Sequence, residues 1–327
     1  MNKSATGVLL VNLGTPEAPT PGAVRAFLRD FLSDPRVVEI PRLIWLCILY
    51  GVILPFRPRK VAHAYASIWT EQGSPLRVLT ESLAARLQAR LSAESGETAP
   101  KVAVAYTYGE PSVAHQLSVL REAGVERTLV LPLYPQYSAT TTGSVYDQCA
   151  AVMKASRDIP DLVIQKHYYS RPDYVRALVN SIRTHRAQHP GADCLLFSFH
   201  GIPRRNVDLG DPYEQHCLHT ARDVATILGL EEHQWRVSFQ SRLGRAEWLK
   251  PYTDETLRQL PSEGIKRLDV ICPAFAIDCL ETLEEIDVEN REVFLESGGE
   301  DYQYIPCLND SEDQVFFLAN LVAERLG

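Results

Sequence analysis

The sequence predicts an α/β protein made of two similar doubly wound domains, each with a parallel sheet. Short apolar runs rich in Val, Ile and Leu alternate with helix-length segments along the 327 residues, which is typical of βαβ units with right-handed crossovers. The halves also resemble each other, because LLVNLGTP is matched by LLFSFHGIP and LVLPLYPQYS by LDVICPAFAIDC. We therefore expect domains over residues 1–158 and 159–327.

Each expected strand is a short apolar run bounded by turn residues, and each expected helix has apolar residues at three- and four-residue spacing. We expect strands at 7–13, 102–106, 127–133, 162–166, 194–199, 235–240, 267–271 and 302–305. We expect helices at 22–32, 59–69, 76–91, 112–122, 145–157, 174–188, 213–228, from about 278 onward, and at 312–326. The last helix is expected to pack back on the first domain.

Composition narrows the class of protein. A hydrophobic content of 45% and a charged content of 23% are ordinary for a globular protein. The net charge of −8 argues against a nucleic-acid partner. The start, MNKSATGVLLVNLG, runs directly into an expected strand, so we expect no leader peptide, and seven cysteines without a CxxC pair favour reduced thiols in the cytoplasm.

An apolar segment interrupts the first domain at about residues 41–57. Its central run, LIWLCILYGVILPF, has 14 residues and lies between Arg42 and Arg57. A membrane-spanning helix needs about 20 apolar residues, so the run is too short to span a bilayer. It is either a buried core helix or an exposed apolar lip, and Trp45, Tyr50 and the flanking arginines favour a lip at a membrane surface.

An acidic helix follows the 267–271 strand, with Asp278 as its expected N-cap. On it Glu281, Glu285 and Glu289 recur every four residues and share one face, where like charges repel. A solvated face is one interpretation. The other is a path for a metal ion or for protons, because carboxylate oxygens bind hard cations and accept protons.

A histidine ends another expected strand. His200 follows the apolar run 194–199 and precedes Gly201, and ligands in such sheets bind beyond the carboxyl ends of the strands. A lone histidine is often structural, but imidazole can take a proton near neutral pH and can bind iron. Glu281 follows a strand of the same half, so the two side chains are expected to point into one cleft.

Loops at other strand ends are rich in aromatic and polar residues. The candidate ligand contacts are Tyr134, Gln240, Ser241 and Trp248, whose types suit a flat aromatic ligand, although each can also serve only to pack a domain junction. Arg57, Arg59 and Lys60 follow the lip and suit either ligand carboxylates or a membrane surface. No GxGxxG or GKS/GKT phosphate loop is present, so a nucleotide cofactor is not supported.

Taken together, the motifs of the chain resemble those of ferrochelatases, the enzymes that insert Fe²⁺ into protoporphyrin IX to make haem. They occur in the family's order along nearly the whole chain. They are NLGTP, the apolar lip, YASIW followed by GSP, LYPQYS, FSFHGIP, GDPY, FQSRLGRAEWLKPYTDETL and CPAFAIDCLETLEEI. NLGTP resembles the protoporphyrin-using Gram-negative branch more than the coproporphyrin-using one.

This resemblance implies a fold of two Rossmann-like domains with parallel sheets and a cleft between the domains. It also implies roles for particular residues. His200 and Glu281 become the catalytic pair on opposing sides of the macrocycle, and Glu285 and Glu289 continue a metal or proton path, so that all four are candidate metal contacts. Two further positions, Phe275 and Asp278, match the lining of the porphyrin site. Arg57, Tyr65 and Ser74 match positions near the porphyrin and its propionates.

Two departures from relatives bear on cofactors. Cys279 stands where some relatives have histidine, which removes one possible iron ligand. The chain ends at Gly327 without the cysteine-bearing tail that holds a [2Fe–2S] cluster in animal enzymes. We expect no cluster and no cofactor beyond the substrate Fe²⁺, although Cys272 and Cys279 leave open an internal cluster of the kind found in some bacteria.

The resulting hypothesis is a cytoplasmic lyase, with the inner-membrane surface as a peripheral contact through the lip. In its mechanism the porphyrin ring is bound buckled, and of His200 and Glu281 one removes the pyrrole protons while the other delivers the metal. A cobalt or nickel chelatase for another tetrapyrrole and a non-catalytic haem carrier are the alternatives. A carrier would not need an acidic ladder beside its histidine.

Overall fold

The computed structural model describes residues 5–244 and 246–327. The described residues form two four-stranded parallel sheets within two compact units, which confirms the predicted fold class. One unit comprises Met1–Tyr134, Ser138–His167 and Asp310–Gly327, and the other comprises Pro135–Tyr137 and Tyr168–Asn309. Part of the segment on which the absence of a leader was predicted, residues 1–4, lies outside the described residues.

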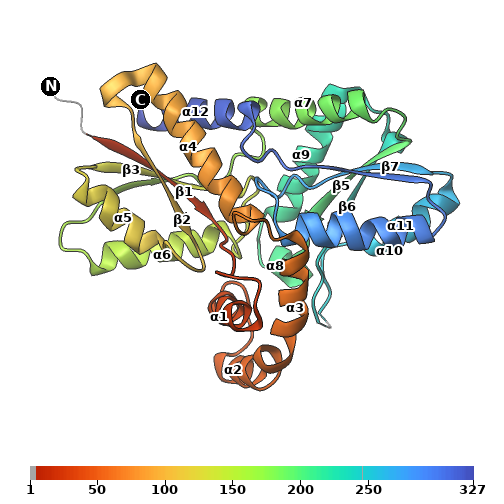
Figure 1. The fold of residues 1–327 in the computed structure, drawn as a ribbon, viewed down its shortest axis with the longest axis horizontal. Helices are drawn as coiled ribbons and strands as arrows, with labels where there is room; N and C mark the ends of the chain where they lie inside the picture. Colours follow the sequence, from red (N-terminus) through yellow and green to blue (C-terminus); the bar gives the residue numbers. More distant parts are fainter. Residues whose placement is uncertain (1–4, 245) are drawn as a thin grey trace. The chain divides into compact units, whose positions relative to one another are not determined.

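The first unit is built on a sheet of order β2-β1-β3-β4 (Figure 1). Its strands are β1 (Thr6–Asn12), β2 (Lys101–Tyr106), β3 (Arg127–Pro132) and β4 (Asp161–Ile164). Its helices are α1 (Pro21–Leu32), α2 (Arg42–Ile48), α3 (Leu54–Ile68), α4 (Pro75–Ser95), α5 (Val113–Glu122), α6 (Thr142–Ala155) and α12 (Glu312–Leu326). In Figure 1, α5 and α6 cover one face of this sheet and α4 and α12 the other.

The second unit repeats this strand order as β6-β5-β7-β8. Its strands are β5 (Cys194–His200), β6 (Trp235–Gln240), β7 (Arg267–Ile271) and β8 (Asp301–Ile305). Its α-helices are α7 (Pro172–Gln188), α8 (Arg204–Asp208), α9 (Tyr213–Leu228), α10 (Thr253–Gln259) and α11 (Asn290–Glu296). The internal repeat read from the sequence is thus also a repeat of topology, because each half orders its four strands in the same way.

The buried strands explain why the sheets form. In β5 every residue from Cys194 to Phe199 is buried, as expected for a parallel strand covered on both faces. The core of the second unit continues through residues of β7, α11 and β8, among them Val270, Phe294 and Tyr302. This packing fixes the central strand, and with it the position of His200 at its carboxyl end.

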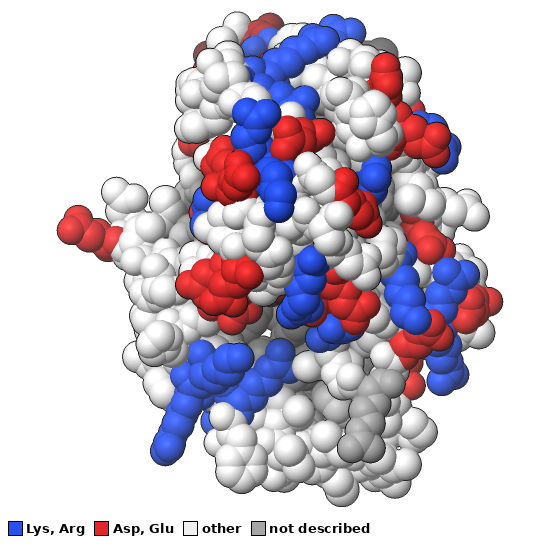
Figure 2. Space-filling view, turned by 90° about the vertical axis from the view of Figure 1, so that its right-hand side faces the viewer, with Lys and Arg blue, Asp and Glu red and all other residues white. Residues whose placement is uncertain are grey.

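The predicted lip is helical. It consists of α2, a π-helix (Leu49–Ile53) and the start of α3. Leu43 and Phe56 are 82% and 75% exposed, whereas Trp45, Leu49 and Leu54 are buried. The segment therefore buries one apolar face and leaves another in solvent, and the lowest part of the molecule in Figure 2, where α2 lies in Figure 1, is largely uncharged.

Two boundaries differ from the sequence-based expectation. The change between units falls after β4, at His167 and Tyr168, rather than at 158. The acidic helix begins at Leu280 rather than at Asp278, and it is a π-helix over Glu281–Glu289 that continues into α11. Helix α12 lies in the first unit, where it contacts α4.

Candidate functional site

Three neighbouring strand ends bring the predicted chemistry together within the second unit. His200 ends β5 and pairs in register with Gln240, which ends β6. On the other side of β5, β7 leads through Cys272 to the π-helix that begins at Glu281. Carboxyl ends of parallel strands meet at one edge of a sheet, so His200, Ser241 and the π-helix share that edge.

His200 has one ring nitrogen fixed and the other available. Its Nδ1 lies 2.6 Å from the Gly201 carbonyl oxygen, and the ring is partly buried with its centroid 6.2 Å from that of Phe275. A carbonyl only accepts hydrogen bonds, so Nδ1 carries the proton and Nε2 of the neutral ring keeps its lone pair. That lone pair can take a proton or bind a metal ion.

Gly201 is required by close packing behind the histidine. A Cβ at this position would lie 2.8 Å from the Gln240 carbonyl oxygen and 3.3 Å from the Trp248 ring. The Trp248 indole is itself held by a 2.9 Å hydrogen bond from Nε1 to the Leu243 carbonyl. The glycine lets the strand end turn closely over its neighbour, and this turn sets the direction of the His200 side chain.

Glu285 is held by two hydrogen bonds from one residue. The Ser241 backbone N–H donates to Oε1 at 2.8 Å, and the Ser241 hydroxyl donates to Oε2. Ser241 adopts a left-handed φ of 65°, which directs both donors at the carboxylate. A pocket of about 190 Å³ adjoins this contact and is also lined by Gln240 and Asn290.

The electrostatics place Glu285 near both members of the predicted pair. Burial raises the pKa of Glu285 above its ordinary value, and the nearby charge of Glu281 raises it further. The hydrogen bonds from Ser241 act in the opposite direction, as does the positive charge of His200 when its ring is protonated. The pKa of Glu285 therefore depends on the charges of both His200 and Glu281.

The three glutamates of the ladder differ in burial. Glu281 and Glu285 are partly buried, whereas Glu289 is exposed. The π-helical winding is visible at its end, where the Asn290 N–H bonds to the Glu285 carbonyl five residues back. Among residues 5–244 and 246–327, no group of three or more His, Cys, Asp and Glu side chains is arranged to hold a metal ion. The metal-contact roles of His200, Glu281, Glu285 and Glu289 stay predictions.

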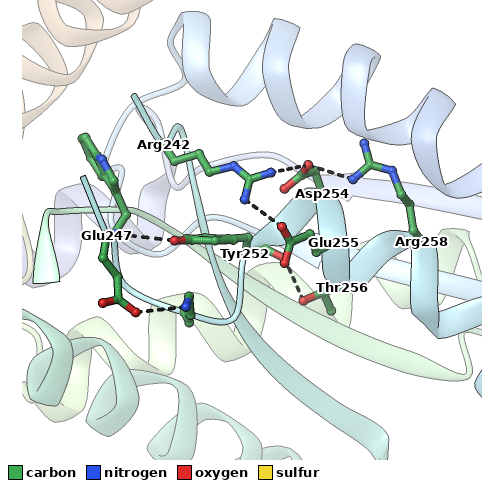
Figure 3. Close-up of polar contacts among 9 residues, drawn as sticks. Arg242, Glu247, Tyr252, Asp254, Glu255, Thr256 and Arg258 are labelled. Carbon is green, nitrogen blue, oxygen red and sulfur yellow. Dashed lines mark hydrogen bonds and ion pairs between the residues drawn. The ribbon is translucent and has the colours of Figure 1, made fainter. Parts of the chain in front are cut away.

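The loop after Ser241 is tied to α10 by an arginine fork (Figure 3). Arg242 pairs with Asp254 at 3.0 Å and with Glu255 at 2.8 Å, and its guanidinium lies 4.2 Å from the Tyr252 ring centroid. Arg258 shares Asp254 at 2.8 Å. A single exposed ion pair contributes little to stability. Here several connected ion pairs hold the side chain of Arg242, the residue after Ser241.

Asp278 is an anchor, and its predicted N-cap role is wrong. Its buried carboxylate accepts from Thr282 Oγ1 at 2.9 Å, Tyr304 OH at 2.5 Å and Asn309 Nδ2 at 2.6 Å. The helix start is instead satisfied locally, because Thr282 Oγ1 accepts from the Cys279 N–H at 2.9 Å. Asp278 thereby joins β8 and the following loop to the acidic helix.

We expect Asp278→Ala to lower the free energy of unfolding by about 3 kcal/mol or more, because three buried donors lose their acceptor. Asp278→Asn should cost less, because it keeps one acceptor oxygen. Urea denaturation measures both. If Asp278→Ala unfolds like wild type and instead weakens porphyrin binding, the residue contacts substrate rather than anchoring the helix.

The remaining predicted ligand residues lie in the first unit. Arg57 and Tyr65 are on α3, and Tyr134 follows β3. Ser74 precedes α4, and its hydroxyl accepts from Thr15 Oγ1 at 2.9 Å, which joins the helix start to the loop after β1. Their contact with a ligand stays a prediction, as does that of Phe275 and Trp248.

Sequence reasoning missed a buried hydroxyl network behind the site. Ser198, Ser238 and Thr253 are all buried and are joined by hydrogen bonds of 3.0 Å and 2.8 Å. The signal was present, because a serine stands between apolar residues in each of two strands, FSF in β5 and VSF in β6. A buried hydroxyl in a strand core needs a partner, and here the partners lead to Gln240.

Comparison with known proteins adds independent information. The family model described as Ferrochelatase matches residues 5–326. A ferrochelatase of Aeromonas hydrophila is 52% identical over 98% of this chain and 99% of that protein. One of Methylococcus capsulatus is 53% identical over 98% of this chain and 97% of that protein.

Solved structures agree on the fold. SirB from Bacillus subtilis with Fe³⁺ aligns with a TM-score of 0.59 at 11% identity, covering 99% of this chain and 96% of that one. CbiX, described as the terminal enzyme for biosynthesis of sirohaem in denitrifying bacteria, aligns with a TM-score of 0.53 at 14% identity, covering 98% of this chain and 100% of that one. At such identity the likeness extends to the fold alone.

Proposed function

The chain belongs to the ferrochelatase family and is a lyase that inserts Fe²⁺ into protoporphyrin IX in the terminal step of haem biosynthesis, and we propose that His200 and Glu281 carry out the insertion. The free macrocycle has two pyrrole N–H groups, so two protons must leave as iron enters. The observation that carries the assignment is the free Nε2 of His200 beside a carboxylate cluster at one sheet edge.

In the proposed mechanism the enzyme binds a buckled ring, because a flat macrocycle keeps its nitrogen lone pairs in the ring plane. His200 and Glu281 act from opposing faces, one accepting pyrrole protons and the other handing over Fe²⁺. The Gly201 carbonyl keeps the His200 ring in the tautomer that either task needs.

We assign the acidic ladder as the route to the pair. Glu289 is exposed, while Glu285 and Glu281 are partly buried, so an ion or proton that passes along them moves stepwise from water into the protein. The two hydrogen bonds from Ser241 hold Glu285 in one orientation along that route. A row of carboxylates that does not enclose the ion suits a substrate, because the ion must be released to the porphyrin.

Among the residues proposed to contact porphyrin, Phe275, Trp248 and Ser241 lie in the second unit. The others, Arg57, Tyr65, Ser74 and Tyr134, lie in the first. Phe275 has the best local support, because its ring lies beside that of His200. Arg57 and Ser74 would bind propionates by charge-assisted and neutral hydrogen bonds.

The direct test is anaerobic incubation of the protein with Fe²⁺ and protoporphyrin IX, followed by absorbance. Protohaem should form catalytically, and Co²⁺ and Ni²⁺ offered under the same conditions measure the metal preference. Stoichiometric binding of added haem without turnover of Fe²⁺ and porphyrin would instead indicate a carrier.

We propose that the enzyme needs no resident cofactor and holds no [2Fe–2S] cluster. Cys272 and Cys279 are reduced and buried, and burial raises the pKa of each thiol well above its ordinary value.

We further propose a cytoplasmic protein that contacts the inner membrane peripherally and binds no nucleic acid. Along the described residues no helix is both long and apolar enough to cross a bilayer. The exposed side chains of the lip, Leu43, Ile44, Tyr50, Val52 and Phe56, are the surface offered to lipid. Elsewhere on the face in Figure 2, groups of acidic and basic side chains alternate, which does not suit a polyanion.

We expect the double variant Leu43→Asp, Phe56→Asp to lose vesicle binding, because each side chain contributes about 2 kcal/mol when it enters an apolar phase. Vesicle co-sedimentation measures the loss. Ile159→Asp is the matched control, since Ile159 is also an exposed apolar residue of the first unit, at 60% exposure, outside the lip. Equal sedimentation of all three proteins would refute the lip as the lipid contact.

A further inference from the structure

Gln240 is hydrogen-bonded toward both members of the proposed catalytic pair. Its backbone carbonyl accepts from the Gly201 N–H at 2.8 Å, directly after His200. Its side-chain Nε2 donates to the Glu281 carbonyl oxygen at 2.9 Å. Gln240 is only 3% exposed, so water does not compete for these contacts. One residue thus connects the strand end that carries His200 with the helix start that carries Glu281.

The orientation of the Gln240 amide is fixed from behind. Ser198 Oγ donates to Gln240 Oε1 at 2.8 Å, and the Cys272 thiol donates to the same oxygen at 3.6 Å. Burial raises the pKa of the Cys272 thiol well above its ordinary value, so it stays protonated as a donor. With Oε1 facing two donors, Nε2 must face the Glu281 carbonyl.

The hydroxyl network makes this arrangement directional. A hydroxyl has one proton, and that of Ser198 is used on Gln240, so Ser198 accepts from Thr253, which in turn accepts from Ser238. Donation therefore runs one way from Ser238 to the Glu281 carbonyl. Because every hydrogen bond in this series points the same way, the Gln240 amide is held in one orientation and both of its polar atoms are bonded to protein groups.

We propose that Gln240 is a positioning residue for metal insertion, which sets the separation between the His200 imidazole and the Glu281 carboxylate. This role deepens the proposed function and rests on it. It also revises the sequence-based interpretation of Gln240 as a porphyrin contact, because the side chain is buried and is bonded to Ser198 of β5, to Cys272 after β7 and to the π-helix. Two groups that act together on one macrocycle need a fixed spacing, and misplacement by about 1 Å can cost about 100-fold in rate.

The test is Gln240→Met, which keeps the length and volume of the side chain and removes both polar atoms. We expect kcat to fall about 10- to 100-fold while the KM values for Fe²⁺ and porphyrin stay near wild type. kcat is expressed per porphyrin-binding site, counted by fluorescence titration, so that loss of folded protein does not count as loss of rate. Gln240→Asn, a milder change that draws the amide back by one methylene, should fall between wild type and Gln240→Met.

Thr220→Ala is the matched control, because it removes a buried hydroxyl of the same unit that lies outside this network. It should lower Tm comparably and keep kcat per site. If Gln240→Met keeps wild-type kcat per site, or if Thr220→Ala loses as much, the positioning role is wrong. Failure of the catalytic assignment is separate, since it would appear as wild-type turnover in variants of Glu281 or His200 themselves.

Discussion

Glu281→Gln is expected to lower the rate of iron insertion by about 100- to 10,000-fold while porphyrin binding stays at the wild-type level. Glutamine keeps the size of the side chain and its backbone carbonyl, so the hydrogen bond from Gln240 Nε2 is retained. What is lost is a carboxylate that can accept a proton or bind Fe²⁺. Anaerobic absorbance assays measure the rate, and quenching of porphyrin fluorescence measures binding.

The matched control for Glu281 is Glu292→Gln. Glu292 is an exposed glutamate on α11, the continuation of the same helix, so its replacement removes the same charge from the same unit. Its turnover should equal that of wild type. Wild-type turnover in Glu281→Gln would show that this carboxylate does not take part in insertion.

His200→Asn should cause a loss of the same order. Asparagine places an amide nitrogen near the position of Nδ1, where it can still donate to the Gly201 carbonyl, but it has no counterpart of Nε2. The variant therefore separates the structural hydrogen bond from the reactive lone pair. We expect about a 100- to 10,000-fold lower rate with porphyrin still bound, measured as for Glu281.

His219→Asn is the control for this change. His219 lies on α9 of the same unit, is 46% exposed and pairs with Asp223 at the surface. It should retain full activity. If His200→Asn also does, the hydrogen bond to Gly201 is the function of the histidine, and the proton or metal must be handled elsewhere.

The sequence was most informative where one local pattern determined the structure. Buried parallel strands are continuous apolar runs, so β5 and β7 were placed to within a residue or two, and strand ends then located His200 and the region of Glu281. The repeated motifs predicted two similar halves, and the shared strand order confirms that similarity.

What could not be predicted depends on contacts between residues far apart in the chain. A Ser, Thr, Asp or Asn before a helical pattern usually indicates an N-cap, and Asp278 fits that pattern. Its carboxylate is taken by Tyr304 and Asn309, about thirty residues away, which no local pattern reveals. The π-helix and the role of Gln240 could not be predicted either. The contacts of Gln240 form only when β5, β6 and the chain after β7 are assembled.

The equal strand order of the two sheets has an evolutionary consequence. Two halves with one topology and two matching motifs are the expected product of the duplication of a half-length ancestor. Both copies kept a tight glycine turn after the first strand, since a Cβ would clash with a carbonyl oxygen at Gly14 as at Gly201. Only the later copy has an imidazole before that turn, and the earlier copy has acquired the long apolar insertion. The strand-end histidine and the apolar insertion could therefore diverge under separate selection within one gene.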